Sequence, residues 1–376
     1  MASMNVLDEV QKVNIENPNH MLGKGLMMPF AASNSGSRKL MFGTQLEHRL
    51  PLLEPEVPYI MTGYENQFGE YSSSYVTMDE DCQVIGIVPK FSWMPKHHYF
   101  IFVQKSNGCF DVIERKEYKH ITENYGYLYD NDYLDSLTVG SYIPKNTPVQ
   151  KSKSFDNFNN RMDGCNMLTM YTACEETMED AIIISESASK KLASPLVKKV
   201  TVIINDNDIP LNLYGSIDRY KSFPNIGEDT VNSILCGLRR EKKEECLFSQ
   251  SYSRLRELSI SDERYTVSGT VVDVDVYCNA PQRLAEYDYN TQLKEYYDNN
   301  LRMCSDIVNL LDPIITDHSK MSYDLQRLYY NSKGILNGKQ YFSERAFSNI
   351  VLEITLVEKI DVLRGVTIMH SLFGNK

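Results

Sequence analysis

Two adjacent carboxylates, Glu179 and Asp180, stand in the segment TMEDAIIISES at 177–187, directly before a run of alanine and isoleucine. Two like charges about 4 Å apart repel by roughly 1 kcal/mol in water and by about 4 kcal/mol at an effective dielectric constant of 20. A fold tolerates such a pair if a cation or a basic side chain compensates it, or if both groups face water. Taken alone, the segment favours a solvated polar entrance to a buried strand over a chemical site.

Arg38 and Arg49 form a second group of candidates, and Lys376 in the terminal Gly-Asn-Lys is a third. Arginine offers a planar set of donors that suits phosphate oxygens, whereas lysine binds phosphate as a point charge. The ordinary alternatives are surface ion pairs with Glu47 or Glu54 for the arginines, and simple solvation for the terminal lysine. The residues alone leave these alternatives open.

Several well-known catalytic motifs are absent from the sequence, namely GxxxxGK[ST], GxSxG, HExxH and a three-aspartate NADFDGD element. The eight cysteines include no C-x-x-C pair, so we expect no zinc site and no disulfide framework. The pair His97-His98 is more typical of a surface turn than of a metal site. If the chain takes part in phosphoryl transfer, the catalytic metal ligands must come from another polypeptide.

The composition is that of a globular protein with 376 residues, 42% hydrophobic and 24% charged, which predicts two or three sub-domains or one domain with a large insertion. The net charge of −11 argues against a free-standing nucleic-acid binder, although one small face could still contact nucleic acid. No run of about 18 apolar residues and no signal-like start is present, so we expect a soluble, intracellular protein.

Hydrophobic patterns predict a mainly β chain with a few helices. We expect Ser37 to cap a first helix, and Asp273 and Asp275 to lie on the solvent side of a half-exposed strand. The predicted strands lie in 59–142 and at 166–171, 181–185, 199–204, 268–279 and 349–359. The predicted helices lie near 185–192, after the loop in 222–235, and over the amphipathic stretch 281–311.

Five collinear segments resemble the β, or second-largest, subunit of multisubunit DNA-dependent RNA polymerases. The stretch 27–65 is similar to the family pattern that runs from I-P-F through an arginine-containing element to R-P-E-x-P-L-V-x-T-G-x-E. The segment 164–187 resembles G-x-N…F-E-D-A-I-x-I-S-E. FPNIGEDTVNSI resembles I-P-N-V-G-E, SGTVVDVDVY resembles S-G-T-V-I-D-V-x-V-F, and LEITLVEKID…FGNK resembles the strand that leads into G-R-H-G-N-K-G.

The resemblance implies a role for each matching residue. Glu179 and Asp180 match the acidic pair beside the active centre, near the second magnesium ion and the incoming triphosphate. Arg38 matches an arginine that contacts the nucleotide phosphates, and Lys376 matches one of two lysines at the RNA 3′ end. A second basic residue falls on His48 or Arg49, according to where a short insertion is placed. The other lysine has no match, because Val366-Thr367-Ile368 occupies its region.

Family members extend beyond both ends of this chain, and their flap is longer than the stretch 235–265. These differences resemble the split RNA polymerases of giant bacteriophages. They predict a companion polypeptide that continues the barrel after Lys376. The expected partners are a β′-like subunit, the remaining β fragments, a promoter-specificity factor, template DNA, RNA and NTPs, with no membrane. Mg²⁺ would be held mainly by the β′-like subunit. The expected location is the cytoplasm of an infected bacterial host, with packaging in the virion left open.

The implied fold is mixed, mainly β with helices: a partial double-psi β-barrel with an inserted flap domain, completed by other chains. The expected divisions are 1–56 (N-terminal segment and active-centre loop), 57–204 (barrel and hybrid region), 205–349 (flap-like insertion) and 350–376 (barrel strand and GNK). The implied function is a non-autonomous β-subunit fragment of an RNA polymerase, a nucleotidyltransferase that is not active alone. The alternative is an inactive polymerase-like regulatory or binding protein, or a structural protein of the virion.

Overall fold

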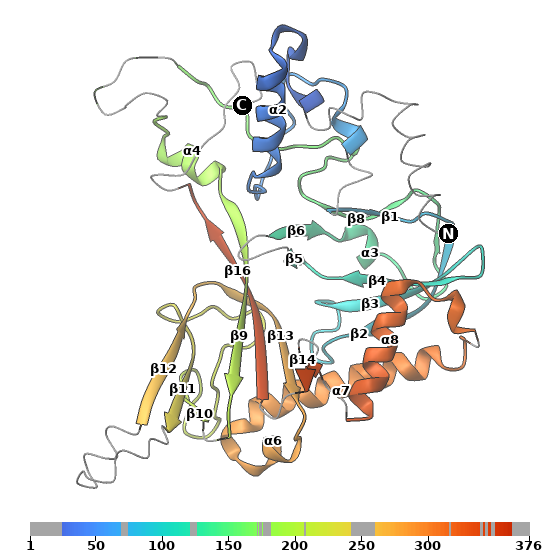
Figure 1. Cartoon of the computed structure of the whole chain (residues 1–376), viewed down its shortest axis with the longest axis vertical. Helices are drawn as coiled ribbons and strands as arrows, with labels where there is room; N and C mark the ends of the chain where they lie inside the picture. Colours follow the sequence, from blue (N-terminus) through green and yellow to red (C-terminus); the bar gives the residue numbers. More distant parts are fainter. Residues whose placement is uncertain are drawn as a thin grey trace.

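The computed structural model describes residues 25–68, 74–120, 126–170, 172, 175, 182–206, 208–241, 260–315, 317–338, 341–342, 345–346 and 350–362. Within these residues the chain folds into antiparallel sheets with helices on one side (Figure 1). None of the described helices combines the length and the apolar composition that a membrane span requires.

Two four-stranded sheets occupy the first half of the described chain. One has the order β4-β3-β2-β7 and the other the order β1-β8-β6-β5. Their strands are β1 (Tyr75–Thr77), β2 (Cys82–Pro89), β3 (Tyr99–Lys105), β4 (Phe110–Arg115), β5 (Tyr118–His120), β6 (Gly126–Asp130), β7 (Tyr142–Ile143) and β8 (Pro148–Ser152). A short helix, α3 (Asp132–Asp135), follows β6, and its Leu134 is buried.

Three long strands form the third sheet, in the order β13-β16-β9, and run side by side near the centre of the molecule (Figure 1). They are β9 (Ser194–Ile204), β13 (Thr270–Cys278) and β16 (Ile350–Ile360). A smaller sheet beside them contains β10 (Asp208–Pro210), β11 (Ile234–Glu241) and β12 (Ile260–Thr266), and β14 (Tyr341–Phe342) pairs with β15 (Arg345–Ala346). The predicted strands at 199–204 and 349–359 are therefore confirmed.

The predicted amphipathic helix is confirmed as α6 (Gln282–Glu286) followed by α7 (Thr291–Leu311), with α8 (Tyr323–Leu336) packed against α7. One end of α7 buries Leu293 against the β9-β13-β16 core, and the other end buries Ile307 in the core it shares with β2, β3 and β4. Gly86 in β2 permits this approach, because a Cβ there would lie 2.4 Å from a methyl carbon of Leu310. Helix α7 thus joins the two sheets through one apolar face.

The strands predicted at 166–171 and 181–185 are wrong, because the described parts, 166–170 and 182–185, contain no strand. Leu168 is fully exposed, and Ile183 is 63% exposed. An apolar run forms a strand only where a neighbouring strand can pair with it, and no described segment pairs with either of these. The pattern recorded apolar side chains correctly but not their surroundings.

The helix predicted after the loop in 222–235 is also wrong. Asn232 and Ser233 have φ values of 52° and 57°, and Val231 bridges to Ile234, where β11 begins. Two successive residues with positive φ make a tight turn and cannot belong to a right-handed helix. The segment is therefore a turn into a strand.

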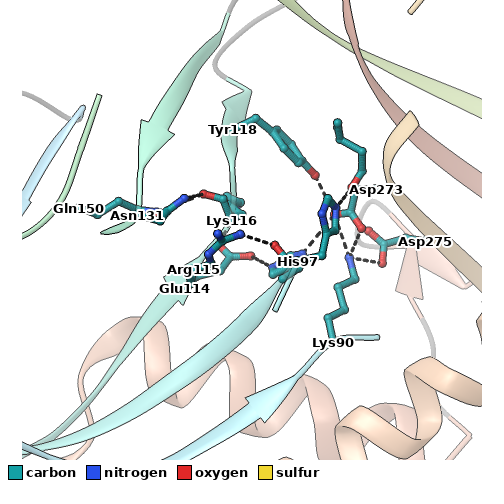
Figure 2. A network of polar contacts seen from close by, with 12 residues as sticks. Lys90, His97, Glu114, Arg115, Lys116, Tyr118, Asn131, Gln150, Asp273 and Asp275 are labelled. Atoms are coloured by element: carbon teal, nitrogen blue, oxygen red, sulfur yellow. Dashed lines mark hydrogen bonds and ion pairs between the residues drawn. The ribbon is translucent and has the colours of Figure 1, made fainter. Parts of the chain in front are cut away.

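The strand 268–279 forms as β13, but its expected exposure is wrong at Asp273, which is 6% exposed. The register of β13 against β16 shifts between Val271 and Asp273, so the bulge changes which side chains face the core. The expectation of a surface turn at His97-His98 is also wrong, since His98 is 3% exposed. Both corrections concern one buried network (Figure 2).

The observed fold confirms a mixed, mainly β chain with helices. The double-psi topology and the four domain divisions stay predictions.

Candidate functional site

Arg38 lies in the first turn of α2 (Gly36–Glu47) and is exposed to solvent. The helix begins earlier than expected: Ser35, not Ser37, is the N-cap, and its hydroxyl oxygen accepts from the Arg38 N–H at 3.4 Å. The guanidinium lies 3.9 Å from the sulfur of Met41, and no ion pair joins it to a carboxylate whose placement the structure describes. Arg38 is therefore free to meet an anion.

The two candidates for a second basic residue differ in their surroundings. His48 follows the last turn of α2, donates its N–H to the carbonyl oxygen of Thr44, and is exposed. Arg49 is largely buried and forms an ion pair with Asp163, which also accepts from Nε of Arg161 at 2.9 Å. Arg49 thus fixes the end of α2 to another segment, whereas His48 faces solvent.

Glu179, Asp180 and Lys376 lie outside the described residues. The helix that follows the acidic pair is α4 (Glu186–Lys191), and the predicted helix at 185–192 is confirmed. Ser185 begins it as N-cap, with its hydroxyl oxygen accepting from the Ala188 N–H at 3.1 Å.

The helix after the acidic pair contacts the end of the strand that precedes Lys376. The Ser189 hydroxyl in α4 donates to the carbonyl oxygen of Val362 at 2.6 Å, and the Val362 N–H donates back to the carbonyl oxygen of Ser189 at 3.4 Å. Strands β9 and β16 pair along their whole length, from Ser194 opposite Ile360 onward. The two chain segments that carry the predicted site residues therefore start from neighbouring points.

A polar cluster joins the segment 54–65 to the segment 164–166 and to the end of α4. The Glu56 carboxylate accepts from the backbone N–H of Asn166 at 2.8 Å, and the Lys191 ammonium lies 2.5 Å from its other oxygen. Glu56 and Gly164 also form a backbone bridge. The hydrogen bond from Lys191 and that from the Asn166 backbone hold the pKa of Glu56 below its ordinary value, despite partial burial.

The sequence Thr62-Gly63-Tyr64-Glu65 closes a tight loop through its last side chain. The buried Glu65 carboxylate accepts from the Thr62 N–H at 2.6 Å, from the Thr62 hydroxyl at 2.9 Å and from the Gly63 N–H at 2.8 Å. Gly63 has a φ of 85°, which favours glycine. The Glu65 carbonyl oxygen accepts from the Arg161 N–H, so this loop also leans on the segment that binds Arg49.

Sequence reasoning did not find the cluster of Glu56, Asn166 and Lys191, because its members are up to 135 positions apart in the chain. The only signal was indirect: Glu56 and Asn166 both occupy positions in the segments that resemble the polymerase patterns.

The surface of these joined segments is apolar and exposed. The exposed apolar side chains are Val57, Tyr59, Met61, Leu168, Met170, Ile182 and Ile183. Exposed apolar groups that gather on one surface commonly mark a contact with another molecule.

No group of three or more metal-ligating side chains gathers in the part of the chain that the structure describes. The predicted contribution of Glu179 and Asp180 to a magnesium site thus rests on residues outside that part. The donor set that the described residues offer here is basic and amide-rich, with Arg38, His48 and Lys191. Such groups suit phosphate oxygens rather than a cation.

No protein-family model matches the chain. Curated relatives do: the chain is 26% identical over 208 residues to the DNA-directed RNA polymerase subunit beta of Streptococcus agalactiae serotype Ia. The corresponding proteins of Streptococcus sanguinis and Streptococcus pyogenes serotype M1 are 25% and 24% identical over the same length. Each match covers 55% of this chain but only 16% of the relative, so the chain spans a small part of the relatives' length. The chain is thus related, at low identity and over about half of its length, to the β subunit of bacterial RNA polymerase.

Proposed function

We propose that the chain is a β-subunit fragment of a multisubunit DNA-directed RNA polymerase. In this role it helps to position the NTP, the RNA 3′ end and Mg²⁺ at an active centre that other chains complete. The observation that carries the proposal is that three segments with polymerase-like patterns lie together. Glu56 joins 54–65 to 164–166, and Ser189 joins the helix after Glu179-Asp180 to the end of β16.

The chemistry of phosphoryl transfer fits a subunit that supplies position and charge rather than a complete catalytic set. Such transfer depends mainly on alignment and on electrostatic stabilisation of the phosphate oxygens. Arg38 is exposed at the start of a rigid helix, where a guanidinium can approach a triphosphate. His48 is the better candidate for the second basic position, because Arg49 is already paired with Asp163.

The acidic pair would act beside the magnesium ions, whose main ligands are expected from a β′-like chain. When bound, magnesium would neutralise the phosphates and polarise the reacting oxygens. Lys376 would hold phosphates at the RNA 3′ end. We also propose a split-subunit polymerase of a large bacteriophage, with partners that include the remaining β fragments and a promoter-specificity factor, acting in the infected cell. The exposed apolar surface around Leu168 and Ile183 supports incorporation into a larger assembly.

Purification of the native complex tests this proposal. The chain is tagged in its natural host system, isolated at moderate salt, and every co-purifying polypeptide is identified by mass spectrometry. The proposal expects a β′-like chain with a three-aspartate motif, a chain that continues the β barrel, and template-dependent RNA synthesis. Isolation of the chain alone, or within a virion structure that lacks any polymerase chain, would contradict it.

A further inference from the structure

A cluster of charged side chains lies between β13 and the sheet formed by β2, β3 and β4 (Figure 2). Lys90, just after β2, places its ammonium 2.8 Å from a carboxylate oxygen of Asp273 and 2.8 Å from one of Asp275. The Tyr118 hydroxyl in β5 donates to Asp273 at 2.8 Å. Buried charges of this kind are costly unless each has a partner, so the number of protons in the cluster matters.

His98 lies between the two sides of this cluster and is 3% exposed. Its Nε2 is 3.0 Å from a carboxylate oxygen of Glu114 in β4, and its Nδ1 is 3.6 Å from a carboxylate oxygen of Asp273 in β13. A neutral imidazole would turn a lone pair toward one of these carboxylates. The protonated ring presents an N–H to each of them, so the geometry fits the charged form.

The balance of neighbouring charges also favours a charged His98. The titratable and charged groups that face it or its partners are Lys90 beyond β2, Glu114 and Lys116 around β4, Tyr118 in β5, and Asp273 and Asp275 in β13. Three carboxylates therefore meet two lysines, and one further positive charge makes the cluster neutral. The adjacent Arg115 is already engaged by both oxygens of Asp135 at 2.9 Å.

Asp275 is the other group that could hold the extra proton, since burial raises its pKa and Lys90 opposes that effect. Two observations favour His98 instead. Asp275 keeps a 2.8 Å contact with the Lys90 ammonium, and its side chain is 27% exposed, which lowers the cost of its charge. Burial alone would lower the pKa of His98, but hydrogen bonding to Asp273 and Glu114 outweighs it and raises that pKa.

We propose that protonated His98 forms a pH-sensitive contact between the two sheets, holding β13 to β4 through Asp273 and Glu114. Because protonation is favoured in the folded state, this stabilisation is fully present below the pKa of a histidine in the unfolded chain, about 6.5. It is lost as the pH rises through the higher folded value. Alkaline conditions therefore loosen the junction between the β2-β3-β4 sheet and the β9-β13-β16 sheet.

Histidine-selective ¹³C labelling and NMR of the full chain test this proposal, with the His98 resonance assigned by its loss in His98→Gln. The proposal expects the His98 midpoint above the ordinary value near 6.5. The thermal unfolding midpoint of the wild type should also fall between pH 6 and pH 9, by on the order of 2–4 °C. His98→Gln should flatten this slope, while His318→Gln, at an exposed histidine outside the cluster, should keep it.

A second variant keeps the proposal testable if His98→Gln does not fold. Glu114 is only partly buried, so Glu114→Gln removes one carboxylate from His98 at a tolerable cost. The His98 midpoint should then move to lower pH. A wild-type His98 that titrates at or below the ordinary value, or a midpoint that Glu114→Gln leaves in place, would overturn the proposal and assign the proton to Asp275.

Discussion

Ser189 and Val362 form two hydrogen bonds with each other, one from the serine hydroxyl at 2.6 Å and one from the valine N–H at 3.4 Å. Ser189 lies in the helix that follows Glu179-Asp180, and Val362 ends the described part of the strand segment that leads to Lys376. This contact places the origins of two predicted site segments side by side. In the proposed function it sets the distance between the acidic pair and the terminal lysine.

Ser189→Ala should lower the free energy of unfolding by about 1 kcal/mol, because it removes one side-chain hydrogen bond to a carbonyl oxygen. Urea unfolding measured by fluorescence checks the value. Ser187→Ala is the matched control: Ser187 is exposed in the same helix, and its hydroxyl contacts only the Ser185 hydroxyl. Equal losses in the two variants would show that the Val362 contact adds nothing to stability.

Arg38→Ala and Arg49→Ala should separate a binding role from a structural one. Arg38 is exposed and has no described acidic partner, so its loss should leave stability unchanged and raise the KM for NTPs about tenfold in the assembled enzyme. Arg49→Ala should instead cost about 1–3 kcal/mol of stability, because it removes the partner of the largely buried Asp163. Thermal unfolding and NTP titrations of both variants make the comparison. The opposite pattern would exchange the two roles.

Glu56→Gln should weaken the attachment of 54–65 to 164–166 by about 1 kcal/mol, since the side chain is partly exposed and solvent screens its ion pair with Lys191. The pKa of Glu56 is lowered in the folded state. Its contribution is therefore present above the unfolded value, about 4.3, and is lost as the pH falls through the folded value. The variant should lose less stability on acidification than the wild type. Glu54→Gln, at an exposed neighbour, should behave as the wild type does.

Lys90→Met should be severely destabilising, by about 3–5 kcal/mol, because it leaves Asp273 buried without its cation. Adding Asp273→Asn in the same chain should recover part of this loss, since the uncompensated charge is then gone. Denaturant unfolding of both variants measures the difference, and Lys320→Met at an exposed lysine provides the control. A double variant no more stable than Lys90→Met would mean that packing of the lysine chain, not charge, dominates.

The sequence predicted those elements whose pattern is local. The amphipathic helix over 281–311 and the strand over 349–359 formed because each presents one apolar face along its own length. Short apolar runs misled where pairing decided the outcome. Residues 166–170 resemble a buried strand, yet no described strand pairs with them, and Leu168 is fully exposed.

Asp273 shows why the polar network could not be predicted. Alternation with valine placed it on the solvent side, but a one-residue bulge and a lysine 183 positions away bury it. The candidate site divides in the same way. Motif order identified the segments that meet, whereas the contacts made by Glu56, Arg49 and Ser189 depend on partners distant in sequence. The roles of Glu179, Asp180 and Lys376 stay predictions.

Single-nucleotide addition by the purified complex tests the central claim most directly. Asp180→Ala is compared with Glu186→Ala, an exposed carboxylate in the helix that follows. If Asp180 acts beside the magnesium ions and the triphosphate, its loss should slow addition by about 10²-fold or more at saturating NTP, with the complex still assembled on its template. Glu186→Ala should retain the wild-type rate. Unchanged nucleotide addition by an intact Asp180→Ala complex would contradict the account.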